Sequence, residues 1–326
     1  MKLKHFFICV AIFALILATP VFAADDDDGD DDGDDTSFYI MLEGAATTAN
    51  GGGGLYTLMG EDIGVPFGMT RSAEMDAAFA PRVSFGWKVG DGWLAVSWSQ
   101  WDDDVLDSVS AAAPDTLWDT LYHADDAWDD FEGTASAMRN IDATTIDLTY
   151  GRKTFGNEKF SGRWMFGLRQ ASLDQMMNVE YNDLINLHLV DLTSEASGIG
   201  FMGGVSGTYN INKKWFATAG FEYSFLTGEV ESNTTMIDTD IAGTFLDLDA
   251  DVTMEEDRMF TMFGASASLV WHPVDAWYVW FGYEFTQWND VVDTMLFPDD
   301  VSEGFIQTDT SDVNFDGFHV GVGFTF

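Results

Sequence analysis

The chain has 326 residues, of which 55 are Asp or Glu and only 14 are Lys or Arg, so its formal net charge at pH 7 is −41. This acidity argues strongly against nucleic acid and anionic lipid headgroups as partners, because both would be repelled, and it favours cations. The single cysteine, Cys9, lies in a segment that we expect to be removed, so neither disulfides nor thiol chemistry is expected in the mature chain.

The amino terminus has the pattern of an export signal. Lys2 and Lys4 precede an apolar run at 6–18 that is too short to cross a bilayer, and Ala23 supplies the small residue of a signal-peptidase site. We therefore predict a signal peptide at 1–23.

The next segment is an acidic tract, which reads DDDDGDDDGDD at 25–35. Such a run repels itself and cannot bury apolar surface, so a disordered acidic tether is predicted at 24–36. Its spacing imitates the first half of a calcium loop, but Tyr39 stands where a bidentate Glu is needed. We expect at most loose association of Ca²⁺ or Mg²⁺, no ordered metal site and no other cofactor.

The remainder, 37–326, contains no further apolar run of 18 residues, which excludes a transmembrane helix. It alternates between apolar residues and polar or small residues, with the period of two that is typical of β-strands. The predicted strands are 37–46, 80–90, 92–101, 140–152, 162–175, 197–210, 214–228, 259–271, 276–287 and 316–326.

Connections of two lengths alternate between these strands. The short ones lie at 89–92, 153–162, 210–214 and 272–276, and the long ones at 47–79, 102–139, 176–196, 229–258 and 288–315. This pattern predicts an all-β, up-and-down antiparallel barrel in the outer membrane of a Gram-negative bacterium, with short periplasmic turns and long acidic extracellular loops. The sheet must close, because an open edge has no hydrogen-bond partners in hydrocarbon. We predict about ten strands, within a range of eight to twelve.

The last strand indicates which face meets lipid. Phe318, Val320, Val322, Phe324 and Phe326 alternate with glycine, histidine and threonine, so the aromatic face is expected to contact outer-membrane lipid and lipopolysaccharide. The glycine face then points into a narrow lumen. We expect the terminal Phe326 to be recognised by the barrel-assembly machinery.

Counting by twos from this strand predicts the charged residues of the lumen. They are Glu43, Arg82, Asp147, Arg169, Glu222, Glu284 and His319. Acids and bases inside an apolar wall must pair or stay hydrated, so they either form a structural network that plugs the bore or line a wet constriction that tunes ion passage. Ten strands lie nearer the filled eight-stranded barrels than the open sixteen-stranded ones.

The acids of the long connections predict a negative extracellular mouth. Those we assign to it are Asp102, Asp103, Asp104, Asp125, Asp126, Asp129 and Asp130. Apolar residues within 114–131 also recur at roughly helical spacing, which is compatible with a short helix over the mouth.

Catalysis has little support. The histidines of the mature chain show no His-x-x-x-His pairing, and no Gly-x-Ser-x-Gly elbow occurs, so we expect no enzyme activity. His123 with Asp125 and Asp126 resembles the Asp-His apparatus of outer-membrane proteases, but such proximity is expected by chance among so many acids. Tryptophans near strand ends predict interfacial girdles; they are Trp87, Trp93, Trp98, Trp101, Trp164, Trp215, Trp271, Trp277 and Trp288.

Three segments resemble one known family. They are 146–183, 198–230 and 277–291, with "GLR", "GYEFTQW" and a glycine-rich strand as the shared motifs. They resemble the Legionella-type pore-forming major outer-membrane proteins, which implies a Gram-negative outer-membrane barrel and pore activity. The Asp tract and the extreme acidity depart from that pattern.

Two functions follow as alternatives. The first is a passive, cation-preferring pore for small cations or solutes, in which the acidic mouth enriches cations within about 8 Å, the Debye length at physiological salt. The second is a non-porous surface barrel whose acidic loops bind divalent cations or a host or cell-surface partner.

Overall fold

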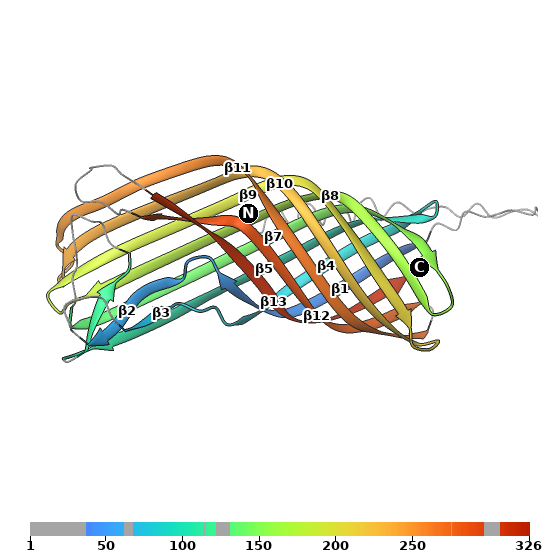
Figure 1. Cartoon of the computed structure of the whole chain (residues 1–326), viewed down its shortest axis with the longest axis horizontal. Helices are drawn as coiled ribbons and strands as arrows, with labels where there is room; N and C mark the ends of the chain where they lie inside the picture. Colours follow the sequence, from blue (N-terminus) through green and yellow to red (C-terminus); the bar gives the residue numbers. More distant parts are fainter. Residues whose placement is uncertain (1–36, 62–67, 114, 122–130, 275, 297–306) are drawn as a thin grey trace, which may run out of the picture. The chain divides into compact units, whose positions relative to one another are not determined.

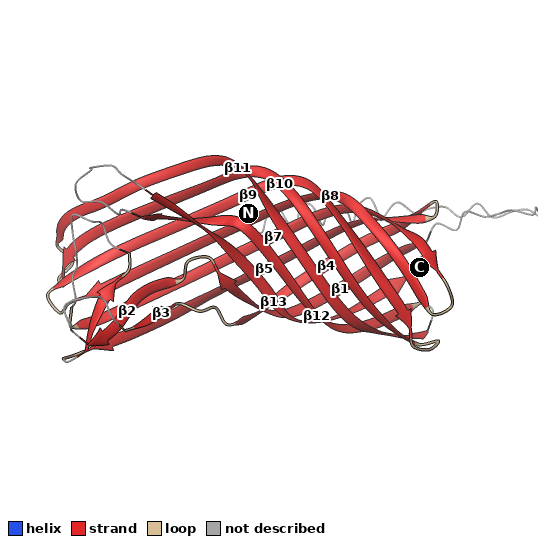
Figure 2. Cartoon of the chain, viewed as in Figure 1, coloured by secondary structure: helices blue, strands red, loops and turns tan. Residues whose placement is uncertain are grey.

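The computed structural model describes residues 37–61, 68–113, 115–121, 131–274, 276–296 and 307–326. The predicted signal peptide at 1–23 and the acidic tether at 24–36 lie outside these residues. In the described part of the chain every regular element is a strand (Figure 2). None of the described residues forms a helix that is long and apolar enough to cross a membrane.

Ten strands run side by side around one closed barrel (Figure 1). They are β1 (Phe38–Gly51), β4 (Ala77–Val89), β5 (Gly92–Ala111), β7 (Gly133–Gly156), β8 (Phe160–Asn182), β9 (Asn186–Asn210), β10 (Trp215–Asp240), β11 (Phe245–Val274), β12 (Trp277–Leu296) and β13 (Gln307–Thr325). Each strand pairs antiparallel with its neighbours, and β1 pairs with both β13 and β4. The predicted ten-stranded antiparallel barrel is therefore confirmed.

The closing seam joins the two ends of the barrel sequence. The Phe38 amide donates to the Phe326 carbonyl at 3.1 Å and the Phe326 amide donates back at 2.9 Å. Their rings stack with centroids 4.8 Å apart. Each of the ten barrel strands has a partner on both sides, so the sheet closes on itself, as a sheet in hydrocarbon must.

The strands extend much further than predicted. β10 has 26 residues and β11 has 30, whereas about 9–11 suffice to cross a bilayer. The long loops predicted at 102–139, 176–196 and 229–258 are wrong in extent, since β8 and β9 are joined by 183–185 and β10 and β11 by 241–244. The ladder continues there because alternation continues, with acids in place of aromatics on the outer face. We call this end of the barrel the extended end, and the opposite end the short-turn end.

The two faces of the wall differ as the last strand predicts. Outward side chains such as Phe201 and Phe318 are 73% and 58% exposed, whereas the inward neighbours Met202 and His319 are buried. These outward aromatic and aliphatic residues form the apolar belt that contacts lipid. Near the short-turn end the inward face carries glycines and polar residues together with the aromatic residues Tyr278 and Trp280.

A small three-stranded sheet lies within the extended end. Its strands are β2 (Leu55–Glu61), β3 (Met69–Ser72) and β6 (Asp115–Asp119). The chain turns inward after β1 through Gly51, Gly52 and Gly53, whose φ angles of 90°, 69° and 69° favour glycine. Tyr56 and Leu117 of this sheet are fully buried against inward residues of the wall. Of the helix considered at 114–131, the described residues form strand at 115–119, and 122–130 lie outside the described part.

Candidate functional site

Seven charged side chains meet inside the barrel near its middle. They come from seven different strands and are Glu43 on β1, Arg82 on β4, Asp147 on β7, Arg169 on β8, Glu222 on β10, Glu284 on β12 and His319 on β13. We call them the charged layer. These are the residues that alternation predicts for the lumen, and the structure brings all seven together; their role as an ion constriction stays a prediction.

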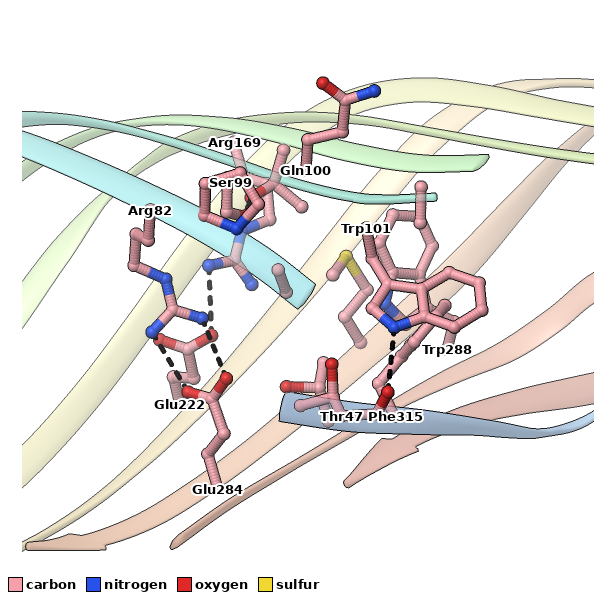
Figure 3. A pocket seen from close by; sticks show the side chains of 16 residues that line it. Thr47, Arg82, Ser99, Gln100, Trp101, Arg169, Glu222, Glu284, Trp288 and Phe315 are labelled. Carbon is pink, nitrogen blue, oxygen red and sulfur yellow. Dashed lines mark hydrogen bonds and ion pairs between the residues drawn. The ribbon is translucent and has the colours of Figure 1, made fainter. Parts of the chain in front are cut away.

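Arg82 anchors the first half of the charged layer. Its Nη1 lies 2.6 Å from Glu43 Oε1. The same Nη1 lies 3.0 Å from Glu284 Oε2, and Nη2 also reaches Glu284 (Figure 3). Trp280 Nε1 donates to the second oxygen of Glu43 at 2.6 Å. Both carboxylates are thereby held by strong charge-assisted hydrogen bonds.

His319 completes this half. Its Nδ1 lies 3.4 Å from Glu43 Oε2 and 3.5 Å from Glu284 Oε2, and its Nε2 shares a 2.8 Å hydrogen bond with Ser268 Oγ. One imidazole and two carboxylates are a conceivable metal-ligand set. Arg82 already pairs with both of these carboxylates, so this group fits an ion-pair network better than a metal site.

Arg169 anchors the second half. Its Nε and Nη2 each lie 2.7 Å from one oxygen of Asp147, which is the bidentate geometry that suits a guanidinium. The same Nη2 lies 3.0 Å from Glu222 Oε1, and Nη1 donates to Ser224 Oγ at 3.2 Å. The Arg169 side chain is only 5% exposed. This cation is therefore buried with its hydrogen bonds satisfied.

Two cavities adjoin the charged layer. One has a volume of about 310 Å³ and is lined by Tyr278, Trp280 and His319 among others. The other, of about 80 Å³, reaches Trp101 and Phe315. Arg82 and Glu284 line both cavities, so their ion pair lies between them.

A layer of packed apolar side chains lies in the lumen next to the charged layer, on the side of the extended end. Buried or partly buried side chains from all ten barrel strands pack in it, and we call them the apolar seal. Trp101 and Trp288 are its largest members, at 4% and 2% exposure, and both rings pack edge-on against Phe315. Assigning these two tryptophans to an interfacial girdle is therefore wrong, because both point inward.

A buried arginine ties the inward-turning chain to the wall beyond the apolar seal. Arg139 donates to the carbonyls of Gly51 and Ala73 and, at 3.0 Å, to Gln175 Oε1. Burial lowers the pKa of the Arg139 guanidinium. Arg139 and Gln175 of the wall thus hold the segment around Gly51 and Ala73 inside the extended end.

The outer wall carries a row of acids beyond the apolar belt. Six of them are direct cross-strand partners on β5, β7, β8, β9, β10 and β11, and we call them the acidic row: Asp102, Asp142, Asp174, Glu195, Glu231 and Glu255. Burial and the Asp102 carboxylate raise the pKa of Asp142, and burial and the Glu195 carboxylate raise that of Asp174. Like charges directly opposite one another destabilise a sheet.

The described acids that we assign to an extracellular mouth lie in a strand and not in a loop. Asp102 and Asp104 belong to β5 and project from the outer wall, whereas Asp103 points toward the interior. The loop assignment is wrong here because the alternating pattern continues through these acids. Asp125, Asp126, Asp129 and Asp130 lie outside the described residues, as does His123.

Sequence reasoning missed the apolar seal, Arg139 with Gln175, and most of the acidic row. Extending each strand by its alternation would have placed Trp101 and Trp288 inside. The acidic row has no such signal, because its members become neighbours only through the register of five strand pairs.

The chain matches one known family over most of its length. The family model of the Legionella pneumophila major outer membrane protein precursor matches residues 53–326. No curated protein matches the chain in sequence. Similar solved structures include the outer membrane protease OmpT from Escherichia coli, at 12% identity and a TM-score of 0.49, covering 89% of this chain and 97% of that one.

Two further structures are more distant. A major outer membrane protein from Thermus thermophilus has 9% identity and a TM-score of 0.33, with 89% of this chain and 99% of that chain covered. The Pseudomonas putida toluene transporter TodX has 6% identity and a TM-score of 0.30, with 95% and 93% covered. Similarities this distant give no information about activity. The family match spans most of the chain, and the chain therefore belongs to the Legionella major outer membrane protein family of outer-membrane β-barrels.

Proposed function

We propose that the protein is a surface barrel with a closed lumen, whose acidic row binds divalent cations and through them the anionic headgroups of the outer leaflet. The observation that carries this proposal is the register that sets six carboxylates directly opposite one another across five strand pairs. On β7, only Thr144 separates the belt residue Ile146 from Asp142 on the outward face. The acidic row is thus close to the polar boundary of the apolar belt.

The physical argument rests on repulsion between neighbouring carboxylates. Directly opposed residues have Cβ atoms about 4.5–5.5 Å apart, and two like charges there repel one another. Ca²⁺ and Mg²⁺ prefer carboxylate oxygens, and Ca²⁺ takes six to eight oxygen ligands, some of which can come from a neighbouring phosphate. A divalent cation between protein carboxylates and lipid phosphates relieves both sets of charges. Anionic lipid, which the chain by itself would repel, then becomes a partner.

Neutralising the acidic row should abolish a cation effect on stability. In chelator, the purified barrel is expected to unfold at a lower urea concentration than in millimolar Ca²⁺, because the carboxylates then repel one another unscreened. The variant Asp142→Asn/Asp174→Asn/Glu195→Gln should lose most of this difference. The urea midpoint is measured in chelator and in Ca²⁺, which tests cation binding by the acidic row. Repeating both measurements in vesicles of phosphorylated glycolipid and of neutral lipid tests whether the cation bridges to anionic headgroups.

The matched control removes the same charge outside the acidic row. Asp191→Asn/Asp247→Asn/Asp251→Asn changes three exposed acids of the extended end. It should keep the Ca²⁺ effect. An equal loss in both triple variants would mean that net charge alone, and not the acidic row, is responsible, which would contradict the proposal.

A narrow, cation-preferring pore is the second candidate. The two cavities beside the Arg82–Glu284 ion pair favour it. The charged layer also contains four carboxylates but only two arginines, which favours cations. Against it stands the apolar seal, which occupies the lumen with packed side chains.

Conductance separates the two candidates. We expect no single-channel steps from the purified barrel in planar bilayers, because packed apolar side chains of the apolar seal should oppose the passage of water and ions. Steps whose reversal potential at low salt favours cations would instead support the pore, with selectivity from the acids of the charged layer. The unfolded chain treated identically is the control.

A further inference from the structure

His188 is a fully buried histidine that the charged layer, the apolar seal and the acidic row leave unused. It lies near the start of β9 with an exposed fraction of 0%. Its ring stacks on that of Tyr181, with centroids 5.8 Å apart. The sequence pattern places it in a long loop, whereas the structure places it on the inward face of the wall, at the extended end.

Two carboxylates approach the same nitrogen of this ring. His188 Nδ1 lies 2.8 Å from Asp238 Oδ1 and 3.6 Å from Asp249 Oδ2. The side chains of Asp238 and Asp249 are 16% and 4% exposed. An Nδ1–H can donate to the nearer oxygen, but 3.6 Å is too long for a hydrogen bond to the second. His188 Nδ1 and one oxygen of each carboxylate therefore lie close together around one point.

The backbone is irregular at this place. Met236 pairs with Ala250 and Ile237 pairs with Leu248, so Asp249 is an extra residue between two pairs of the ladder. Such a β-bulge re-aims a side chain, and bulges are over-represented beside functional sites. Strict alternation from the inward Ala250 would turn Asp249 to the outer wall, whereas the bulge brings its carboxylate to His188.

We propose that His188, Asp238 and Asp249 bind a divalent transition metal of the Zn²⁺ type. Zn²⁺ binds imidazole nitrogen at about 2.0–2.1 Å and carboxylate oxygen at about 2.0–2.2 Å, so tetrahedral donor atoms lie about 3.4 Å apart. The observed separations of 2.8 and 3.6 Å bracket that value. All three donor atoms lie within 4.8 Å of one another.

The charges of these three groups also suit a divalent metal. A divalent metal with a neutral imidazole and two carboxylates forms a set with no net charge, and such a set is less costly to bury than a charged one. The mixed nitrogen and oxygen donor set selects Zn²⁺ and similar ions over Ca²⁺ and Mg²⁺, which prefer oxygen ligands only.

Zinc titration of the purified, chelator-treated barrel tests this site. Millimolar Ca²⁺ is included in the buffer to compete with Zn²⁺ for exposed carboxylates, and calorimetry should then find one Zn²⁺ per chain. His188→Ala and Asp249→Asn should each weaken Zn²⁺ binding by more than about 100-fold, since loss of a ligand should cost more than the 10- to 100-fold typical of losing a partner that orients one. X-ray absorption at the zinc edge should detect imidazole scattering, which His188→Ala abolishes.

Two controls keep the outcomes distinct. Asp251→Asn makes the same chemical change two residues further along β11, at an exposed position, and should leave zinc affinity within twofold of the unmodified protein. The Asp142→Asn/Asp174→Asn/Glu195→Gln variant should also keep zinc binding, so failure of the acidic row does not affect this test. Absence of zinc binding, retention of zinc binding in a folded His188→Ala barrel, or equal loss in Asp251→Asn would overturn the site.

Discussion

Replacing Arg169 with methionine is expected to lower the free energy of unfolding of the barrel by about 3–5 kcal/mol. Arg169 is 5% exposed and donates to both oxygens of Asp147, while Glu222 and Ser224 take its remaining contacts. Without the guanidinium, two carboxylates stay in the lumen with no cation at that place. The cost is set by the charges left behind more than by the bonds lost.

The measurement is urea unfolding in detergent or lipid vesicles, followed by tryptophan fluorescence. Arg152→Met is the matched control, because Arg152 makes an equally short ion pair of 2.6 Å with Asp91, but both side chains are exposed. That pair should contribute no more than about 1 kcal/mol. An Arg169→Met cost no larger than that of Arg152→Met would contradict a buried, tightly coupled network.

A second variant separates charge from packing. Arg169→Met combined with Asp147→Leu and Glu222→Gln removes the stranded charges together with the cation. Apolar replacement of a complete buried network is often neutral, so this variant should recover much of the lost stability. If it does not, the network contributes through its geometry and not only through charge balance.

Truncating Trp288 to alanine should cost about 3–5 kcal/mol of unfolding free energy, because a large buried side chain leaves a cavity. The side chain is 2% exposed in the apolar seal and packs on Phe315 from β13. The control is Trp215→Ala, since Trp215 is 39% exposed on the outer wall, where lipid or detergent can fill the space it leaves. The same unfolding measurement applies.

Trp101 offers a check on the apolar seal as a unit. Its ring lies 5.3 Å from that of Phe315, which Trp288 also contacts, so the two truncations share a partner. Neighbouring sites couple by about 0.5–3 kcal/mol in double-mutant cycles. Additive effects of Trp101→Ala and Trp288→Ala, with no coupling, would argue against one packed layer across the lumen.

Much of the charged layer was predictable because a strand has only two faces. Once Phe326 is assigned to lipid, counting by twos places His319 and Glu284 inside, and the short connections carry the count from strand to strand. The two arginines follow in the same way. Alternation does not predict which acid pairs with which base. Arg82, for example, pairs with Glu284, which lies 202 residues away in the sequence.

The ends of the strands were not predictable from composition. Runs of acidic residues are typical of loops, so the sequence predicts that the strand ends at Trp101. The same boundary predicts that Trp101 lies at the membrane interface. In the structure β5 continues to Ala111 because its partner β7 also continues, and each additional pair satisfies the backbone of both strands. Strand length depends on the partner as much as on the strand itself.

By itself, the sequence determined a closed antiparallel barrel of about ten strands, its lipid-facing side, and the identity of the charges in its lumen. The reason is that side chains alternate between the two faces of a strand with a period of two, and this pattern can be recognised within one strand without knowing which strands are its neighbours. Only the tertiary structure decided the apolar seal, the inward turn of the small sheet, the acidic row, and the convergence of His188, Asp238 and Asp249. Each of these depends on the register between strands, on a one-residue bulge or on contacts across the lumen, and such long-range pairings leave no periodic trace in the chain.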